Sequence, residues 1–383
     1  MVNLPESSKI DVSPLASAFN DVTNSYKFFW FISILDCVQR GEERIIPVSR
    51  LLCSMVAYAW FPVNYFRLSF GKQDRLSRIV EMLKRDCNIP INASRQDVHR
   101  HAIQQMQLRT PVGREIRALG EYVPQRFLRP FFQQQLRGMP DRKVDATIKS
   151  LASATNSGAS RLVLYLFVER DGVECIEITT AWYEYMTAHI SILKGFCLWH
   201  LLQYLQKNNP NVPNLASKIL APTKRDLSRA HQFWDAILAV LGTQVTCIYS
   251  GKAITPENYT LDHFLPWRFV AHDLLWNIVP ATKEANSSKS DSLPDIDVYF
   301  DRFSSLQYEA VQTALKHKLN SKLLDDYIML LKAPSLSSLQ TLSYDHFRAK
   351  LLDSIAPQVH LARSMGFSIG WVYANDLQVT QES

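Results

Sequence analysis

The stretch that decides the fold of this chain runs from Cys247 to Pro294 and reads CIYSGKAITPENYTLDHFLPWRFVAHDLLWNIVPATKEANSSKSDSLP. Within it, Asp262 and His263 close a short apolar segment that the pattern predicts to be a β-strand turning at the next proline. Asn277 lies in a second apolar segment, LLWNIVP, and Asn286 falls in a polar NSSK turn. We expect Asn286 to open the helix that closes this unit.

These residue types suit the hydrolysis of a phosphodiester bond. Asp262 and Asn286 offer a carboxylate and an amide oxygen, the hard ligands that suit Mg²⁺. His263 has a side chain whose ordinary pKa lies near neutrality, so it can take a proton from water. We expect Asn277 to hydrogen-bond the backbone across the loop, and Lys289, near Asn286, to contact phosphate.

The three motifs YTLDHFLP, WNIVP and NSSKSDSLP, in this order, resemble the HNH endonucleases, the ββα-metal nuclease family, and are most similar to the HNH domain of Cas9. The resemblance implies Asp262 and Asn286 as metal ligands, His263 as general base and Asn277 as the residue that orients the loop. It also implies Mg²⁺ as cofactor, with Mn²⁺ able to substitute, and DNA as substrate, with RNA left open. The flanking segments resemble uncharacterised bacterial HNH proteins.

The cysteines argue against a structural zinc. Many HNH proteins carry two CxxC pairs around the module, whereas here Cys247 stands alone with Ser250 at its partner's place, so we expect no structural zinc. The six cysteines form no CxxC pair, which indicates reduced thiols in a cytoplasmic protein. The first residues do not look like a signal peptide, and no apolar run reaches the roughly 20 residues of a membrane span.

The remaining sequence predicts an α+β fold, a predominantly helical body that carries a β-hairpin and the embedded ββα-metal HNH module. The hairpin is expected over residues 161–179, around the tight-turn dipeptide Asp171-Gly172. A long helix is expected from Trp182 to about Lys207, and another over residues 223–241 with Thr223 as its cap. We predict four segments: a helical, basic domain (1–155), the hairpin plus long helix (156–215), the nuclease module (216–295) and C-terminal helices (296–383).

Positive charge is concentrated outside the module. Lys72 to Lys149 holds sixteen basic and eight acidic residues, whereas Cys247 to Pro294 holds four basic and five acidic residues. If the protein binds nucleic acid, most of the electrostatic attraction is expected from the first of these regions. The candidate contacts are Arg114, Arg117, Arg126 and Arg129. The alternative is an ordinary solvated, arginine-rich helical surface.

Three functions are compatible with these patterns. The first is a metal-dependent DNA endonuclease that cuts one strand per active site. The second is a catalytically silent nucleic-acid-binding or scaffold subunit whose HNH fold is only structural. The third makes the module the effector of a bacterial anti-phage defence system, held inactive until a regulatory partner engages it; a homodimer is also compatible.

Overall fold

The chain forms two compact units in the computed structural model. The N-terminal unit comprises residues 1–210 and 215–222, and the C-terminal unit comprises residues 211–214 and 223–383. The structure describes residues 4–153, 163–222, 225–255 and 257–374. The predicted limit between the first two segments, at residues 155 and 156, lies outside the described residues. The limits of the four predicted segments stay predictions.

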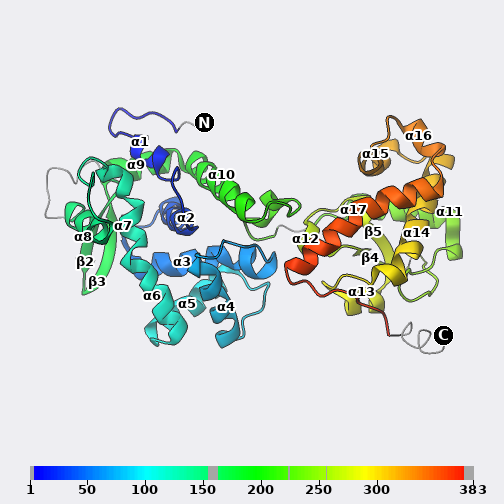
Figure 1. The fold of residues 1–383 in the computed structure, drawn as a ribbon, viewed down its shortest axis with the longest axis horizontal. Helices are drawn as coiled ribbons and strands as arrows, with labels where there is room; N and C mark the ends of the chain where they lie inside the picture. Colours follow the sequence, from blue (N-terminus) through cyan, green and yellow to red (C-terminus); the bar gives the residue numbers. More distant parts are fainter. Residues whose placement is uncertain (1–3, 154–162, 223–224, 256, 375–383) are drawn as a thin grey trace. The chain divides into compact units, whose positions relative to one another are not determined.

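The N-terminal unit is mainly helical, with one small sheet (Figure 1). Its helices are α1 (Ser13–Ser17), α2 (Tyr26–Gln39), α3 (Val48–Trp60), α4 (Arg75–Cys87), α5 (Arg95–Gln107), α6 (Pro111–Ala118), α7 (Val123–Phe127), α8 (Asp141–Leu151), α9 (Thr180–Ala188) and α10 (Ile190–Asn208). Its strands are β1 (Ile45–Pro47), β2 (Tyr165–Arg170) and β3 (Val173–Ile178). The shorter helical turns are η1 (Phe61–Tyr65), η2 (Leu119–Glu121), η3 (Arg129–Phe132) and η5 (Leu215–Lys218).

Two apolar helices form the centre of this unit. Nearly every side chain of α2 and α3 is buried, as expected for helices that are apolar on all sides. Helix α3 packs against α2 and α5, and α10 packs against the other side of α2. The end of α2, the length of α3 and the start of α5 line one pocket.

The predicted hairpin is confirmed as strands β2 and β3. Asp171 and Gly172 form its turn with φ values of 53° and 72°, the positive values that a tight two-residue hairpin turn requires. A third strand that the sequence did not reveal, β1, pairs antiparallel with β3. The sheet order is therefore β1-β3-β2.

The single long helix predicted from Trp182 to Lys207 is wrong, because the segment contains two helices. Helix α9 ends before His189, whose φ of −119° and ψ of 21° leave the α-helical region, and α10 starts immediately after it. The His189 ring packs against Tyr185 at a centroid distance of 4.8 Å. The helix is thus interrupted at His189, where this ring contact forms, although no proline or glycine at that point signals the interruption in the sequence.

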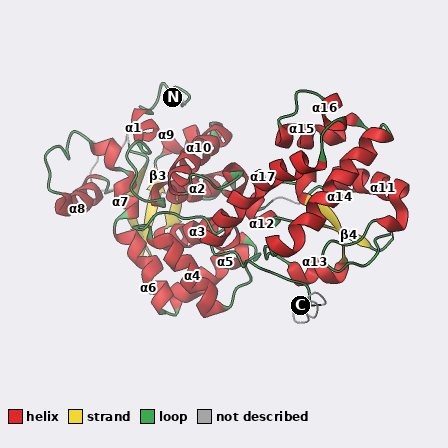
Figure 2. Ribbon diagram, turned by 45° about the vertical axis from the view of Figure 1, so that its right-hand side comes forward, coloured by secondary structure: helices red, strands yellow, loops and turns green. Residues whose placement is uncertain are grey.

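The C-terminal unit surrounds a two-stranded sheet with helices (Figure 2). Its helices are α11 (Ser228–Leu241), α12 (Trp267–Val270), α13 (Lys283–Lys289), α14 (Ile296–Lys316), α15 (Asp325–Leu331), α16 (Leu336–Gln340) and α17 (Tyr344–Ser364). Its strands are β4 (Tyr259–His263) and β5 (Ile278–Thr282), and its short turns are η6 (Gly242–Gln244), η7 (Leu275–Asn277) and η8 (Ser321–Leu324). Helix α11 begins at Ser228, later than predicted, and the proposed cap Thr223 lies outside the described residues.

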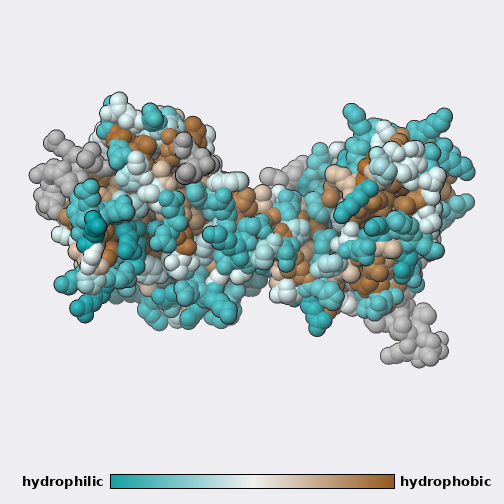
Figure 3. All heavy atoms as spheres, turned by 45° about the horizontal axis from the view of Figure 1, so that its top comes forward, coloured by the Kyte–Doolittle hydropathy of each residue, from teal (hydrophilic) through white to brown (hydrophobic). Residues whose placement is uncertain are grey.

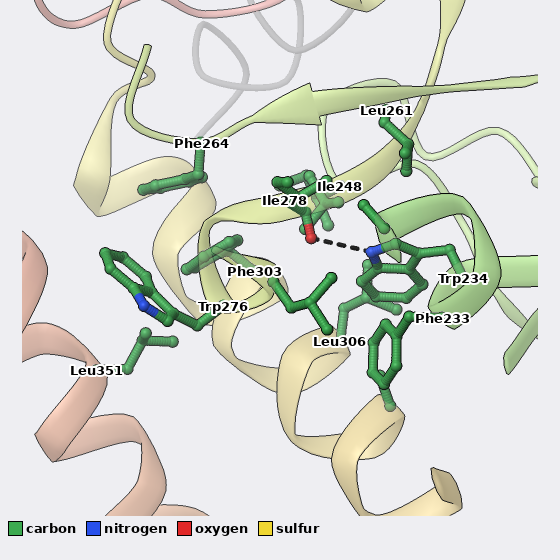
Figure 4. Close-up of a cluster of buried hydrophobic side chains, with 14 of the residues drawn as sticks. Phe233, Trp234, Ile248, Leu261, Phe264, Trp276, Ile278, Phe303, Leu306 and Leu351 are labelled. Atoms are coloured by element: carbon green, nitrogen blue, oxygen red, sulfur yellow. Dashed lines mark hydrogen bonds between the residues drawn. The ribbon is translucent and has the colours of Figure 1, made fainter. Parts of the chain in front are cut away.

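One apolar core holds this sheet against helices α11 and α14 (Figure 4). Trp234 is fully buried, and its indole Nε1 donates a hydrogen bond of 3.1 Å to the carbonyl of Ile278 in β5. Gln307 on α14 donates to the same carbonyl at 2.9 Å. The rings of Phe264 and Phe303 stack at a centroid distance of 4.0 Å. The strand pair is thus fixed to two helices by both apolar and polar contacts.

Hydrophilic residues predominate on the face of each unit that Figure 3 displays, with smaller apolar areas between them. Within the described residues, no helix combines the length and apolar character needed to cross a membrane. The mostly helical α+β fold predicted from the sequence is confirmed.

Replacing Trp234 by alanine should destabilise the C-terminal unit. The substitution leaves a cavity in a closely packed core and deprives the Ile278 carbonyl of a donor, so the free energy of unfolding should fall by about 3–5 kcal/mol. Chemical denaturation measures this loss. The matched control is Trp199→Ala, because Trp199 is 48% exposed and should cost about 1 kcal/mol or less. Equal losses from both substitutions would contradict the anchoring role of Trp234.

Candidate active site

The site is built on the antiparallel pair β4 and β5 and on helix α13. Asp262 lies opposite Val279 and His263 lies opposite Ile278, the last pair of the ladder. Asp262 and His263 are thus the last two residues of β4, where the strand meets the loop that leads to β5. Helix α13 follows β5 directly, with the Thr282 hydroxyl accepting a hydrogen bond from the backbone of the first turn.

Asn286 does not open this helix, as the sequence had suggested. Helix α13 begins at Lys283, where Thr282 provides the cap, so Asn286 is its fourth residue and Lys289 its last. Both side chains nevertheless reach back to β4. Lys289 bonds to Asp262 and His263, and Asn286 bonds to the carbonyl of Leu261.

Asn277 connects the two ends of the loop between the strands. Its Oδ1 accepts from the backbone N–H of Leu265 at 2.8 Å, and its Nδ2 donates to the Leu265 carbonyl at 3.0 Å. The Asn277 carbonyl also accepts from the N–H of Phe264 at 2.8 Å. The side chain is completely buried, so these bonds satisfy polar groups that water cannot reach. Asn277 therefore fixes the chain immediately after His263.

The Asp262 carboxylate is buried between a tyrosine and a lysine. The Tyr249 hydroxyl donates to its Oδ2 at 2.6 Å, and Lys289 Nζ lies 3.0 Å from the same oxygen and 3.2 Å from Oδ1. Lys289 Nζ also donates to the carbonyl of His263 at 2.6 Å. Asp262 and Lys289 are 5% and 0% exposed, so their opposite charges compensate each other out of contact with bulk water.

Tyr249 reaches this position from a tight hairpin over residues 245–254. The hairpin is closed by backbone hydrogen bonds between Cys247 and Lys252 and between Ile254 and Val245, each 2.8 Å long. Burial, and then the negative charge of Asp262, raise the pKa of Tyr249 far above its ordinary value. Its hydroxyl therefore stays protonated and keeps donating to the carboxylate.

His263 is oriented by a second carboxylate. Its Nε2 lies 2.8 Å from Oδ1 of Asp273, in the loop that follows α12. Because an ionised carboxylate only accepts hydrogen bonds, Nε2 carries the proton and Nδ1 is left with a free lone pair in the neutral ring. His263 is 4% exposed, and Asp273 is half-buried. This arrangement gives the imidazole a defined basic nitrogen.

Asn286 could contribute an oxygen ligand to a hard divalent cation. Its Nδ2 donates to the carbonyl of Leu261 and to Oγ1 of Thr260, so its Oδ1 is the atom that a cation would meet. With the carboxylate of Asp262, this provides one charged and one neutral oxygen ligand, a set suited to Mg²⁺. No group of three or more His, Cys, Asp or Glu side chains in the described part of the chain is arranged to hold a metal.

Comparison with known proteins identifies this segment. Residues 247–295 match the HNH endonuclease family. Searches of curated proteins and of solved structures found no match. The resemblance to the HNH domain of Cas9 therefore stays a prediction. The matched residues, which we call the HNH segment, include most of the hairpin, both strands and α13, and the match indicates a nuclease.

The four arginines predicted to contact nucleic acid belong to the N-terminal unit, not to the HNH segment. Arg126 is held by Asp145 and Asp141, with its closest contact 2.8 Å long, and Arg117 Nη2 donates to the carbonyl of Met106. The two others are less constrained. Arg114 bonds to a neighbouring carbonyl on an exposed surface, and Arg129 is 54% exposed with its carboxylate partner 4.0 Å away.

Sequence reasoning missed two residues of the site, Tyr249 and Asp273. Tyr249 lies between Cys247 and Ser250, and no spacing pattern in the sequence connects it to Asp262. Asp273 lies ten residues after His263, in a segment that shows no periodic pattern. A search for carboxylates near a candidate base could have singled out Asp273, but only the path of the loop brings it to the imidazole.

Replacing Lys289 by methionine should destabilise the HNH segment in the absence of divalent metal. The buried Asp262 carboxylate would lose its compensating charge, which should lower the free energy of unfolding by about 3–5 kcal/mol. Adding Asp262→Asn removes the uncompensated charge, so the double variant should recover part of this loss. Chemical denaturation in EDTA of both single variants and the double variant tests the pair. Simply additive losses would show that the two side chains are not coupled.

Proposed function

We propose that this chain is a metal-dependent HNH endonuclease that hydrolyses DNA phosphodiester bonds, one strand per active site. The observation that supports the proposal is that Asp262 and His263 are the last two residues of β4, and that Asn286 on α13 bonds to the same strand, within the segment that matches the family. A general base and two oxygen ligands for a cation are the groups that this hydrolysis requires.

His263 is the proposed general base. The bond from Nε2 to Asp273 supports this role, because it fixes the ring and leaves Nδ1 able to take a proton from the attacking water. Asp273 also stabilises the imidazolium that forms when the proton arrives. Asn277 contributes by positioning: its two bonds to Leu265 hold the backbone on which His263 depends.

Asp262 Oδ and Asn286 Oδ1 are the proposed ligands of Mg²⁺, with Mn²⁺ as a possible substitute. When bound, the ion supplies positive charge to the phosphate oxygens and to the leaving oxygen. Lys289 competes for the same carboxylate, since its ammonium lies 3.0 Å from Asp262. If a divalent ion were bound to Asp262, the Lys289 ammonium would be available to a phosphate oxygen.

Because the site is buried, we expect the residues around it to rearrange before DNA can bind there. Asp262, His263 and Lys289 are each 5% exposed or less, so a DNA strand needs a rearrangement to reach them. A regulatory partner of an anti-phage defence system, or a second copy of the chain, would supply such a trigger. The neutralised Asp262–Lys289 pair also suits the alternative function, a catalytically silent scaffold or nucleic-acid-binding subunit. Cleavage assays separate these possibilities.

His263→Ala should slow cleavage of supercoiled plasmid by about 10²–10⁴-fold in Mg²⁺ or Mn²⁺, because it removes the base. EDTA should abolish cleavage by the wild-type chain. Agarose gels that separate supercoiled, nicked and linear DNA follow the reaction, and nicked circles should form first if one site cuts one strand.

The matched control is His317→Ala, an exposed histidine at the end of α14. It should cleave as the wild type does. Equal cleavage by His263→Ala and wild type would remove His263 as the base. No cleavage by wild type with either metal would favour the scaffold or the partner-gated effector.

DNA binding should depend on the less constrained arginines of the N-terminal unit. The double variant Arg114→Gln/Arg129→Gln should bind DNA more weakly and reduce the slope of log K against log salt by roughly 2, since each phosphate contact contributes about 0.9. Fluorescence anisotropy in EDTA at several salt concentrations measures the slope. Lys9→Gln, an exposed cation outside the basic region, is the control. An unchanged slope in the double variant would show that these arginines do not face DNA.

A further inference from the structure

A pocket in the N-terminal unit gathers three arginines that the nuclease site does not use. It has a volume of about 310 Å³ and lies where the end of α2 meets α3 and α5. Its lining includes Arg40, Arg50, Arg95, Ser54, Tyr58 and Gln96. The pocket therefore combines charged and polar side chains with an apolar part, and it has room for more than a single small ion.

The charges around this pocket do not cancel. Four cationic side chains lie at or beside it and contact two carboxylates, which gives a net charge of +2; they are Arg40, Arg50, Arg95 and Lys194, with Asp36 and Glu42. His99 adds no charge, because burial lowers its pKa and the nearby arginines lower it further. A positive field thus converges on the pocket.

The arginines keep hydrogen-bond donors for a ligand. Among the described contacts, each guanidinium uses one nitrogen: Arg40 Nε, Arg50 Nη2 and Arg95 Nη2 all approach a carboxylate at 2.7–3.3 Å. Their side chains are 38–55% exposed. A guanidinium offers five N–H donors in a planar fork, so most of them remain free to bind an oxyanion.

Two of these side chains are also held in place. The Arg95 guanidinium lies 4.3 Å from the centroid of the Tyr58 ring, and Arg50 Nη2 is fixed by Glu42 at 2.7 Å. Tyr58 itself is buried on α3. A site whose donors are already oriented loses less conformational entropy when it binds.

We propose that this pocket binds a phosphate monoester, carried either by a molecule of about nucleotide size or by the end of a nucleic acid. A monoester has a charge of about −1.5 to −2 at neutral pH, which matches the excess of +2. Its oxygens suit the paired N–H groups of arginine. The volume accommodates the group that bears the phosphate, with Ser54 and Gln96 as polar contacts.

Isothermal titration calorimetry on the full chain, in EDTA to prevent cleavage, tests this proposal. The probes are inorganic phosphate, adenosine 5′-monophosphate, and one short DNA oligonucleotide with either a 5′-phosphate or a 5′-hydroxyl. The nucleotide, or the phosphorylated oligonucleotide in preference to its hydroxyl form, should bind. Arg50→Gln and Arg95→Gln should each weaken that binding by about tenfold, as the loss of a charge-assisted contact predicts.

The controls separate a specific site from general positive charge. Arg85→Gln removes an exposed arginine of the same unit and should leave the affinity unchanged. Ser54→Phe fills the pocket while retaining all three arginines, and it should abolish binding in a chain whose circular dichroism is unchanged. Binding of adenosine 5′-monophosphate that is lost in these pocket variants would support the proposal and identify a nucleotide-sized ligand. A preference for the 5′-phosphorylated oligonucleotide that is lost in the same variants would support it and identify the end of a nucleic acid. Undiminished affinity in the variants, or no binding of any probe up to about 10 mM, would overturn it.

Discussion

The buried contact between Asp262 and Lys289 is the interaction on which the candidate site depends. Placing a charge out of water is costly unless an opposite charge and hydrogen bonds compensate it. Asp262 obtains both, from Lys289 at the end of α13 and from Tyr249 in the 245–254 hairpin. The Asp262 carboxylate therefore links the strand, the helix and the hairpin, and the side chains that would serve catalysis also help to hold the segment together.

Sequence reasoning succeeded where the information is local. Asp171-Gly172 specifies a turn through its own backbone preferences, and the apolar segment that ends at Asp262 and His263 indicates a strand. It failed where distant contacts decide. The break at His189 leaves no turn signal, and the approach of Asp273 to His263 depends on the path of a loop. The periodicity of apolar residues predicts which face of a helix or strand is buried, but it does not predict which loop packs against that element.

The arginines show why a charge count is an incomplete guide to binding. The region from Lys72 to Lys149 has a large excess of basic residues, yet Arg126 is occupied by two aspartates and Arg117 by a backbone carbonyl. Around the pocket of Arg50 and Arg95, the acids are fewer than the cations and most N–H donors remain available. The groups that contact an arginine side chain in the folded protein decide whether it can bind a phosphate. The linear sequence does not reveal those contacts.

The two donors on the carbonyl of Ile278 have a consequence for the solution behaviour of the chain. An isolated pair of strands exposes unpaired backbone groups along its outer edges, and such edges invite pairing with other molecules. Here the indole of Trp234 and the amide of Gln307 occupy an outward-facing carbonyl of β5. An incoming strand would find this acceptor already satisfied and shielded by bulky side chains. The helices thus protect a minimal sheet from edge-to-edge aggregation at this position.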